Sequence, residues 1–310
     1  MTQEKTQVKK KSIFSSFSLF TTLLFIFLFL YAASMVVLLA WALLTALKSN
    51  MEFLYNPLWL PRGNISTWEW TNFQRVFKEM YVPVSYKSGP YAGFSNVKIN
   101  LMGLVTYSIL YAVGSAFVGV LAKCVTAYVV SRFDFRIGKI IYGAVIVTMM
   151  LPIVGSAPSE MAITQALGIY DTFIGAWIQK ASFIGLYFLI FFDSFRFIPK
   201  DYVEAATLDG AGEFTIFFKI MLPLVKNTFV MIFLLLFIEY WNDYQTPLLY
   251  LPTHPTVMYA TQQLSKRQES GFEQPMRMAC CIMVAMPIIV LFAIFSDKIM
   301  GDLTVGGVKG

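Results

Sequence analysis

The chain has 310 residues, of which 57% are hydrophobic and only 14% are charged, and its formal net charge is +6. Soluble domains carry about 25% charged residues, so the composition excludes an ordinary soluble protein and predicts a membrane protein. We attribute the positive charge to Lys and Arg residues that flank membrane spans, and we predict no nucleic-acid partner. The cysteines form no CxxC pair and His254 is the single histidine, which predicts neither a disulfide framework nor a metal site.

Six apolar segments follow one another along the chain. Each is interpreted as a membrane helix, because about 20 apolar residues cross the hydrocarbon core of a bilayer. They lie at residues 19–47, 99–130, 140–157, 174–195, 228–250 and 277–299. The first segment is too long for the apolar region of a signal peptide and lacks a clear cleavage site, so we predict an uncleaved span. The predicted fold class is an all-α polytopic membrane protein with six transmembrane helices. Its membrane domain covers 19–300, between short tails at 1–18 and 301–310.

Six spans place both termini on one side of the membrane, and the positive-inside rule predicts that this side is the cytoplasm. The clearest inner loop is the tight turn at 131–136, which carries Arg132 and Arg136. The long segment at 49–98 is then external, and it is too polar to span. We therefore expect a multi-pass protein of the bacterial cytoplasmic membrane, surrounded by lipid.

The segment between the fourth and fifth spans, at 197–224, has the pattern of a helix, a bend and a second helix. Pro199 and Asp201 are typical of a helix start. Gly210 suits a bend, because glycine adopts the backbone conformations that tight turns need. A short second helix follows, and we expect Pro223 to end it. Such an element on the cytoplasmic face can press into a groove of a soluble partner.

The same segment carries a seven-position motif. Glu-Ala-Ala is followed after three residues by Gly, and after nine more by Ile, one residue and Leu-Pro. The matching residues are Glu204, Ala205, Ala206, Gly210, Ile220, Leu222 and Pro223. The segment resembles the loop through which ABC importer permeases dock on their ATPase. The resemblance implies that these residues, together with Asp209, form the ATPase-docking site, and that Glu204 pairs with a basic residue of the ATPase. The alternative is an ordinary amphipathic surface loop with a solvated Glu204.

Other segments resemble the smaller permease subunit of maltose-type sugar transporters. They lie at 126–136, 167–172, 241–243 and 303–310. The chain departs from that family at Tyr107-Ser108, where members usually have Asn-Ser. The resemblance implies the architecture of a type I importer permease. It also implies a second permease subunit in a heterodimer, two copies of a cytoplasmic ABC ATPase, and an extracellular or periplasmic solute-binding protein. We expect no cofactor in this chain, because it has no GxxxxGK[ST] phosphate loop; ATP and Mg are expected on the ATPase.

The fifth span contains the candidate residues of the solute pathway. Glu239 and Asp243 are four residues apart, which predicts that they share a helical face. Acidic residues at membrane depth normally face the bundle interior or a water-filled cavity. The candidates are Glu239, Trp241, Asn242, Asp243 and Tyr244, since carboxylates and amides bind sugar hydroxyls and aromatic rings pack on sugar C–H faces. A polar clamp between helices is the alternative, and the sequence leaves both open.

The predicted function is that of a non-enzymatic permease subunit. It belongs to an ATP-driven importer that moves a carbohydrate, most simply an oligosaccharide, and it couples ATPase motion to alternating access. One alternative is a different solute in the same superfamily, such as a phosphosugar, polyol or peptide. A second is an ion-coupled secondary transporter, which broken helices or inverted repeats would favour. A third is a membrane-embedded enzyme, against which the sequence lacks HExxH and GxSxG motifs.

Overall fold

The computed structural model describes residues 19–86, 92–133, 135–151, 155–266 and 273–301. The predicted tails at 1–18 and 301–310 lie outside these ranges, apart from Gly301. The described elements are α1 (Leu19–Ala46), α2 (Asn50–Tyr55), the 3₁₀ turn η1 (Ile65–Thr67), α3 (Thr71–Glu79), β1 (Tyr81–Val84), β2 (Val97–Asn100), α4 (Leu101–Arg132), α5 (Arg136–Met150), α6 (Ala157–Ala166), α7 (Phe173–Gln179), α8 (Leu186–Phe197), α9 (Asp201–Leu208), α10 (Glu213–Ile216), the π-helical turn η2 (Phe217–Met221), α11 (Leu222–Leu224), α12 (Lys226–Trp241), α13 (Gln245–Tyr250), α14 (Val257–Lys266) and α15 (Gln274–Gly301).

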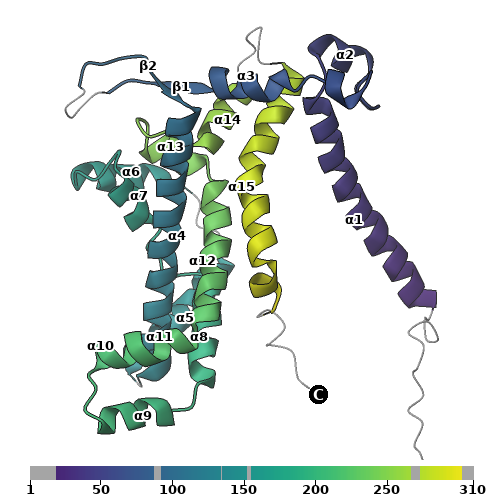
Figure 1. Cartoon of the computed structure of the whole chain (residues 1–310). Coiled ribbons are helices and arrows are strands. Elements are labelled where there is room, and N and C mark those ends of the chain that lie inside the picture. Colours follow the sequence, from purple (N-terminus) through teal and green to yellow (C-terminus); the bar gives the residue numbers. More distant parts are fainter. Residues whose placement is uncertain (1–18, 87–91, 134, 152–154, 267–272, 302–310) are drawn as a thin grey trace, which may run out of the picture.

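The fold is predominantly helical, as predicted. The prediction of an all-α chain is corrected at one place, where β1 and β2 form an antiparallel hairpin that pairs Tyr81 with Asn100 and Val84 with Val97. This hairpin and α9 lie at opposite ends of the molecule (Figure 1). We call these the hairpin end and the α9 end.

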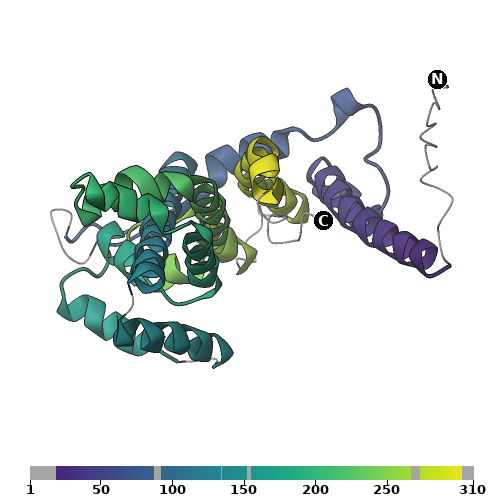
Figure 2. The ribbon, with the colours of Figure 1, turned by 90° about the horizontal axis from the view of Figure 1, so that it is seen from below.

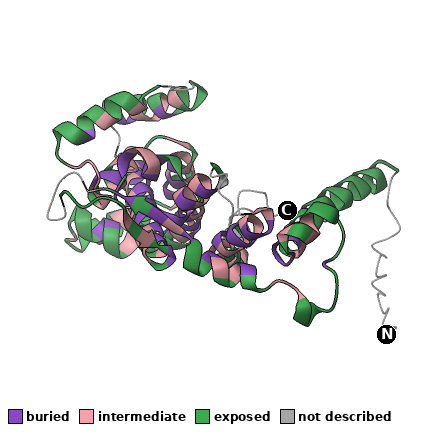
Figure 3. Cartoon of the chain, turned by 90° about the horizontal axis from the view of Figure 1, so that it is seen from above, coloured by how far each residue is buried: buried purple, intermediate pink, exposed green. Residues whose placement is uncertain are grey.

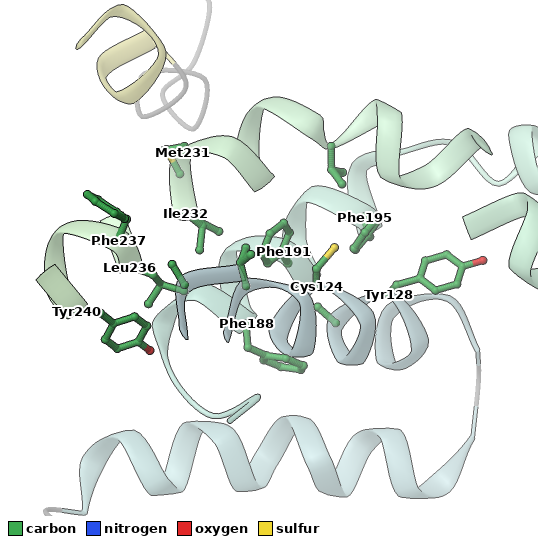
Figure 4. Packing of buried hydrophobic residues seen from close by; sticks show 14 of the residues in the cluster. Cys124, Tyr128, Phe188, Phe191, Phe195, Met231, Ile232, Leu236, Phe237 and Tyr240 are labelled. Atoms are coloured by element: carbon green, nitrogen blue, oxygen red, sulfur yellow. The ribbon is translucent and has the colours of Figure 1, made fainter. Parts of the chain in front are cut away.

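Helices α4, α8 and α12 form the centre of the bundle (Figure 1). Helix α4 presents the small, fully buried residues Ala112 and Ala116, which let neighbouring backbones approach closely. Phe188, Phe191 and Phe195 of α8 are also fully buried, and their spacing of three and four residues puts them on one helical face. They point into the same cluster as buried residues of α4 and α12 (Figure 4). A second apolar cluster lies at the hairpin end, among α3, β1, α14 and α15.

Helix α1 leans away from the bundle and is joined to it at the hairpin end (Figures 1 and 2). The side-chain amide of Asn72, on α3, donates to the carbonyls of Ala46 and Lys48, both at 2.9 Å. These bonds satisfy carbonyl groups that a helix end leaves unpaired. The ammonium of Lys48 donates to the Asn56 carbonyl at 2.7 Å, and burial lowers the pKa of this lysine below its ordinary value.

The rest of α1 is apolar and exposed along almost its whole length (Figure 3). Exposed apolar surface on this scale has to be covered by lipid or by another protein chain. The helix therefore adds little to the core of this chain and offers its surface to the surroundings.

Three described helices are long and apolar enough to cross a membrane, namely α1, α4 and α15. Helix α12 makes a fourth when it is taken together with residues 213–224, from which it is bent by 77°. The prediction of an unbroken helix over 174–195 is wrong. Helix α7 ends at Gln179 and α8 begins at Leu186, and Gly185 between them has a φ of +123°. The third predicted segment is present as α5, which has 15 residues.

Candidate functional site

Helix α9 starts where the sequence predicts. It begins at Asp201, and its first turn contains the carboxylates of Asp201 and Glu204. Negative charge is favoured at this end of a helix by the helix dipole. Both side chains are exposed, so each carboxylate is available to a partner.

The predicted bend after α9 is also present. Gly210 has a φ of +79°, a left-handed conformation that glycine adopts without steric cost. The amide of Ala211 donates to the Ala206 carbonyl and the amide of Gly210 donates to the Thr207 carbonyl, both at 3.0 Å. These two bonds form a Schellman motif. A side chain added at Gly210 would meet no atom of the described residues within 4 Å. Within the described part of the chain, only the backbone conformation requires glycine at this position.

The second helix of the segment runs further than predicted. It passes Pro223 and ends at Leu224, where the chain turns by 77° into α12. Before the proline, the amide of Leu222 bonds to the Phe217 carbonyl, five residues back. A proline lacks an amide hydrogen, and its ring clashes with the carbonyl four residues earlier in a regular α-helix. The widened π-helical turn lies directly before Pro223, where this clash would otherwise occur.

The residues of the docking motif divide into an outward and an inward set. The exposed residues are Glu204, Ala205, Asp209, Gly210 and Pro223. Ala206 is buried, and Ile220 and Leu222 are half-buried against the central cluster. Met221, which lies between Ile220 and Leu222 in the sequence, is fully buried and packs the second helix against the central cluster. The motif thus combines an anchor to the bundle with an exposed surface.

That exposed surface is unusually apolar. Leu208 is 88% exposed, Phe214 84% and Tyr202 51%. Large apolar side chains gathered on a surface mark a site of interaction. With Glu204 on the same short helix, the α9 end offers both apolar area and a negative charge to a partner.

Among the pathway candidates, Asp243 has the most hydrogen-bond partners. Its Oδ2 accepts from the hydroxyls of Tyr111 at 2.7 Å and Thr246 at 2.6 Å, and it lies 3.2 Å from the ammonium of Lys180. Its Oδ1 accepts from the amides of Gln245 and Thr246 at 2.9 and 3.0 Å. The carboxylate therefore links α4, the end of α7 and the start of α13.

Trp241 points to a different part of the molecule. Its side chain is buried and its Nε1–H donates to the Val284 carbonyl of α15 at 3.1 Å. It lines an apolar cavity of about 350 Å³ among α3, α4, α14 and α15. This tryptophan packs α12 against α15 and lies apart from the Asp243 carboxylate.

The structure does not bring the five pathway candidates together. The prediction that Glu239 and Asp243 share a helical face is wrong, because α12 ends at Trp241. Glu239 and Asn242 are exposed, and Tyr244 is 37% exposed. Asp243 has the contacts of a clamp between helices, whereas the other polar candidates remain accessible.

Comparison with known proteins places the chain in a family. Residues 115–300 match the model of the family described as "Binding-protein-dependent transport system inner membrane component". The chain belongs to this family. It is a permease, a multi-pass component of a transporter in the cytoplasmic membrane, and not a catalytic enzyme.

Individual relatives agree with this assignment. The permease is 32% identical over 224 residues to the trehalose transport system permease protein SugB of Mycobacterium tuberculosis, covering 70% of this chain and 78% of that protein. It is 27% identical over 270 residues to the melibiose/raffinose/stachyose import permease protein MelC of Bacillus subtilis, covering 86% and 89%. Among solved structures, a bacterial ABC transporter involved in the import of alginate matches with a TM-score of 0.71 and 19% identity, over 90% of this chain and 95% of that chain. This last match shows a shared fold.

Two lysines of the permease that sequence analysis did not select hold the broken fourth segment. Besides Asp243, the ammonium of Lys180 contacts the Thr246 hydroxyl at 2.9 Å. Lys123 of α4 is 5% exposed, and its ammonium donates to the Ser182 carbonyl at 2.7 Å. Ser182 lies in the break between α7 and α8, so no helical hydrogen bond satisfies this carbonyl. The signal that could have found them is a cation within an apolar segment.

The break also bears on the choice of transporter class. Interrupted helices are a feature of ion-coupled secondary transporters, the class that sequence analysis kept as an alternative. The family match of the permease decides against that class, and the break is instead a local feature held by Lys123 and Lys180.

Proposed function

We propose that this permease is one of two membrane subunits of an ATP-driven importer for an oligosaccharide. Two copies of a cytoplasmic ABC ATPase drive the importer, one of which binds the α9 end of this subunit, and a solute-binding protein delivers the sugar at the hairpin end. ATP and Mg are held by the ATPase, and this chain contributes no ATP site. Both termini lie in the cytoplasm, and the six crossings are α1, α4, α5, the broken pair α7 and α8, α12, and α15.

The observation that carries the proposal is the preformed element from α9 to α11. Its Schellman bend and buried Met221 fix its shape before any partner binds. Its exposed side chains, Leu208 and Phe214 above all, are left largely uncovered by the described residues. A preorganised surface of this kind loses little conformational entropy on binding, which suits an element that transmits ATPase motion to the spans.

A second permease subunit is supported by α1. This helix has little contact with its own bundle except at its hairpin end. A helix of another subunit beside it would bury apolar surface that is otherwise left to lipid. We infer a heterodimer, with the solute pathway between the two subunits.

A sugar as the solute is supported by the relatives. Their names specify trehalose for SugB, melibiose, raffinose and stachyose for MelC, and diacetylchitobiose for NgcG of Streptomyces coelicolor, which is 25% identical over 284 residues. In this chain, the exposed Glu239, Asn242 and Tyr244 could present a carboxylate, an amide and an aromatic ring to sugar hydroxyls and C–H groups.

Association with the ATPase tests the docking proposal. We would co-express the permease pair with its ATPase and measure how much ATPase co-purifies with the wild type and with Glu204→Arg. The charge reversal leaves α9 intact but opposes a basic residue of the partner, so we expect the ATPase to be lost. Glu79→Arg, the same charge change at the hairpin end, is the matched control and should retain it. Equal co-purification for all three proteins would contradict the proposal.

Transport tests the solute. We would measure uptake of labelled trehalose, raffinose and a chitobiose derivative into proteoliposomes that contain the complex, the binding protein and internal ATP. We expect ATP-dependent uptake of at least one of these sugars, unaffected by ionophores. Uptake that collapses with an ion gradient, or that accepts only non-sugar solutes, would contradict the proposed function.

A further inference from the structure

Glu239 of α12 presents an exposed carboxylate in the middle part of the helix bundle. It attracts Lys123 of α4 electrostatically, and at 1.5 Å per residue this lysine lies about 14 Å from the α9 end of α4. Four residues after Glu239, Asp243 bonds to Tyr111, about 15 Å from the other end of α4. Glu239 therefore lies between these two levels, away from both ends of a helix that is long enough to cross a membrane.

This carboxylate has no close partner within the described part of the chain. The ion pairs there are made by Glu79, Asp171 and Asp243, and the side chain of Glu239 makes no hydrogen bond. Acidic residues at membrane depth normally face a bundle interior, a water-filled cavity or a partner charge. Because Glu239 is exposed, it does not face the interior of this bundle. It faces either a water-filled pathway or the second subunit.

The neighbouring side chains favour a water-filled pathway. Asn242, nearly one turn further along the chain, is also exposed, and its side-chain nitrogen is held by a bond of 2.9 Å to the Ile238 carbonyl. Tyr187 of α8 is half-buried and lies within the electrostatic influence of Glu239. A carboxylate, an amide and a phenol together form a polar strip that is wider than a single ion pair requires.

The two lysines nearest this strip are already engaged. Lys123 is 5% exposed and its ammonium donates to the Ser182 carbonyl. The ammonium of Lys180 contacts Asp243 and the Thr246 hydroxyl, and it lies over the ring of Tyr240, 5.1 Å from the ring centroid. An anionic group that enters the pathway would therefore meet the carboxylate of Glu239 before any available cation. Like charges brought together in a partly desolvated site repel strongly.

We propose that Glu239 is a specificity-determining residue that excludes acidic sugars, so that this permease passes uncharged oligosaccharides. The proposal rests on the proposed function, in which Glu239 faces the solute. An uncharged sugar can donate its hydroxyl hydrogens to the carboxylate, which acts only as an acceptor when it is ionised. A phosphosugar or a sugar acid brings a second negative charge to the same place.

Charged thiol reagents measure the potential beside Glu239. The complex with Asn242→Cys would be solubilised in detergent at low ionic strength, so that both sides are open, and treated with a cationic or an anionic methanethiosulfonate. Modification at position 242 is followed by mass spectrometry. We expect the ratio of the cationic to the anionic rate to fall about fivefold when Glu239→Gln is added, the effect of one charge about 8 Å away in water. Glu79→Gln, which removes an exposed carboxylate at the hairpin end, is the matched control and should leave the ratio unchanged.

Transport connects this potential to selection. Uptake of a neutral disaccharide and of its carboxylate-bearing derivative would be compared in proteoliposomes, at equal concentrations of sugar-loaded binding protein. We expect the wild type to transport the neutral sugar much faster, and Glu239→Gln to narrow the difference by raising uptake of the acidic derivative. Equal uptake of the two sugars by the wild type, or no gain of acidic uptake in Glu239→Gln, would overturn the proposal.

The reagents also test the alternative location of this face. If neither reagent modifies Asn242→Cys, the second subunit or lipid covers Glu239 and the proposal is wrong. Leu235→Cys, one turn before Glu239 on the same helical face, is the second reporter if Asn242→Cys does not assemble. The reagent measurement needs neither ATP nor transport. Absence of neutral-sugar uptake would therefore count against the proposed function, whereas an unchanged rate ratio with normal neutral uptake would count against this inference alone.

Discussion

The phenol of Tyr111 donates a hydrogen bond of 2.7 Å to the carboxylate of Asp243, a residue 132 positions further along the chain. The same oxygen accepts a hydrogen bond from the ammonium of Lys180, so three separate parts of the permease meet at one carboxylate. Their side chains are mostly buried, with 17% of Asp243 and 23% of Lys180 exposed. The arrangement fixes the end of α12 relative to α4 and to the broken fourth segment.

Asp243→Asn should lower stability rather than change solute affinity alone. The amide keeps the shape of the carboxylate but leaves Lys180 without a counter-charge in a largely buried position. Removing one partner of a buried hydrogen bond costs about 1–3 kcal/mol. We expect a lower midpoint of thermal unfolding for the detergent-solubilised complex, with reduced yield of assembled permease pair. Normal stability combined with altered sugar selectivity would support the pathway interpretation instead.

A double-mutant cycle isolates this ion pair. Lys180→Met removes the charge and keeps a long side chain, so the double variant Lys180→Met/Asp243→Asn should lose less stability than the two single losses added together. Tyr111→Phe removes only one hydroxyl and should cost about 1 kcal/mol. Additive losses in the cycle would show that Lys180 and Asp243 are not coupled.

The bend at Gly210 gives a graded prediction. Asn tolerates positive φ better than other residues with side chains, whereas Val is β-branched and strongly disfavoured there. Gly210→Asn should therefore keep the bend and Gly210→Val should strain it by about 1–3 kcal/mol. The measurement is solute-stimulated ATP hydrolysis by the reconstituted complex. We expect it to be lost in Gly210→Val.

The Asn variant then separates the bend from the docking contact. No described residue occupies the space beside Gly210, so we attribute any defect of Gly210→Asn to contact with the partner's surface. Full coupling in both variants would show that the bend has no role in docking.

The docking element could be predicted from sequence because its signals are local. Asp201 opens a helix, Gly210 closes it with a left-handed residue, and both lie within one short stretch. The extent of the second helix was missed, because a proline in the sequence normally predicts a helix end, whereas here the helix passes Pro223 after a π-helical turn.

The break in the fourth segment could not be predicted from hydropathy. The run from 174 to 195 is apolar almost throughout, and the features that stabilise its interruption come from elsewhere in the chain. Lys123 reaches the Ser182 carbonyl over 59 positions, and the backbone oxygen of Lys180 would lie only 3.2 Å from a side-chain carbon added at Gly119. Long-range contacts of this kind leave no periodic pattern in the segment itself.

Asn72 should be required to hold the end of α1. Asn72→Asp is the same size but has no amide donor, so both bonds to the carbonyls of Ala46 and Lys48 are lost and a carboxylate faces two carbonyl oxygens. We expect a loss of about 1–3 kcal/mol of local stability, measured as faster hydrogen exchange at residues 44–50. Asn72→Gln keeps the donor on a longer side chain and should show a smaller effect. Helix α1 also packs against α15, and unchanged exchange in the Asp variant would mean that this packing alone positions α1.

The orientation of the permease is tested by surface labelling of single cysteines. A cysteine-free background requires replacement of Cys124, Cys280 and Cys281, of which the first two are buried. Into it we would place a cysteine at Ser66, exposed at the hairpin end, or at Thr215, exposed at the α9 end. In intact cells a membrane-impermeant thiol reagent should label only the cysteine at 66, because basic residues near the α9 end hold that end in the cytoplasm. After permeabilisation of cells that express the permease pair without its ATPase both should react, which verifies that the cysteine at 215 is accessible. Labelling of position 215 alone in intact cells would invert the orientation and remove the docking loop from the ATPase side.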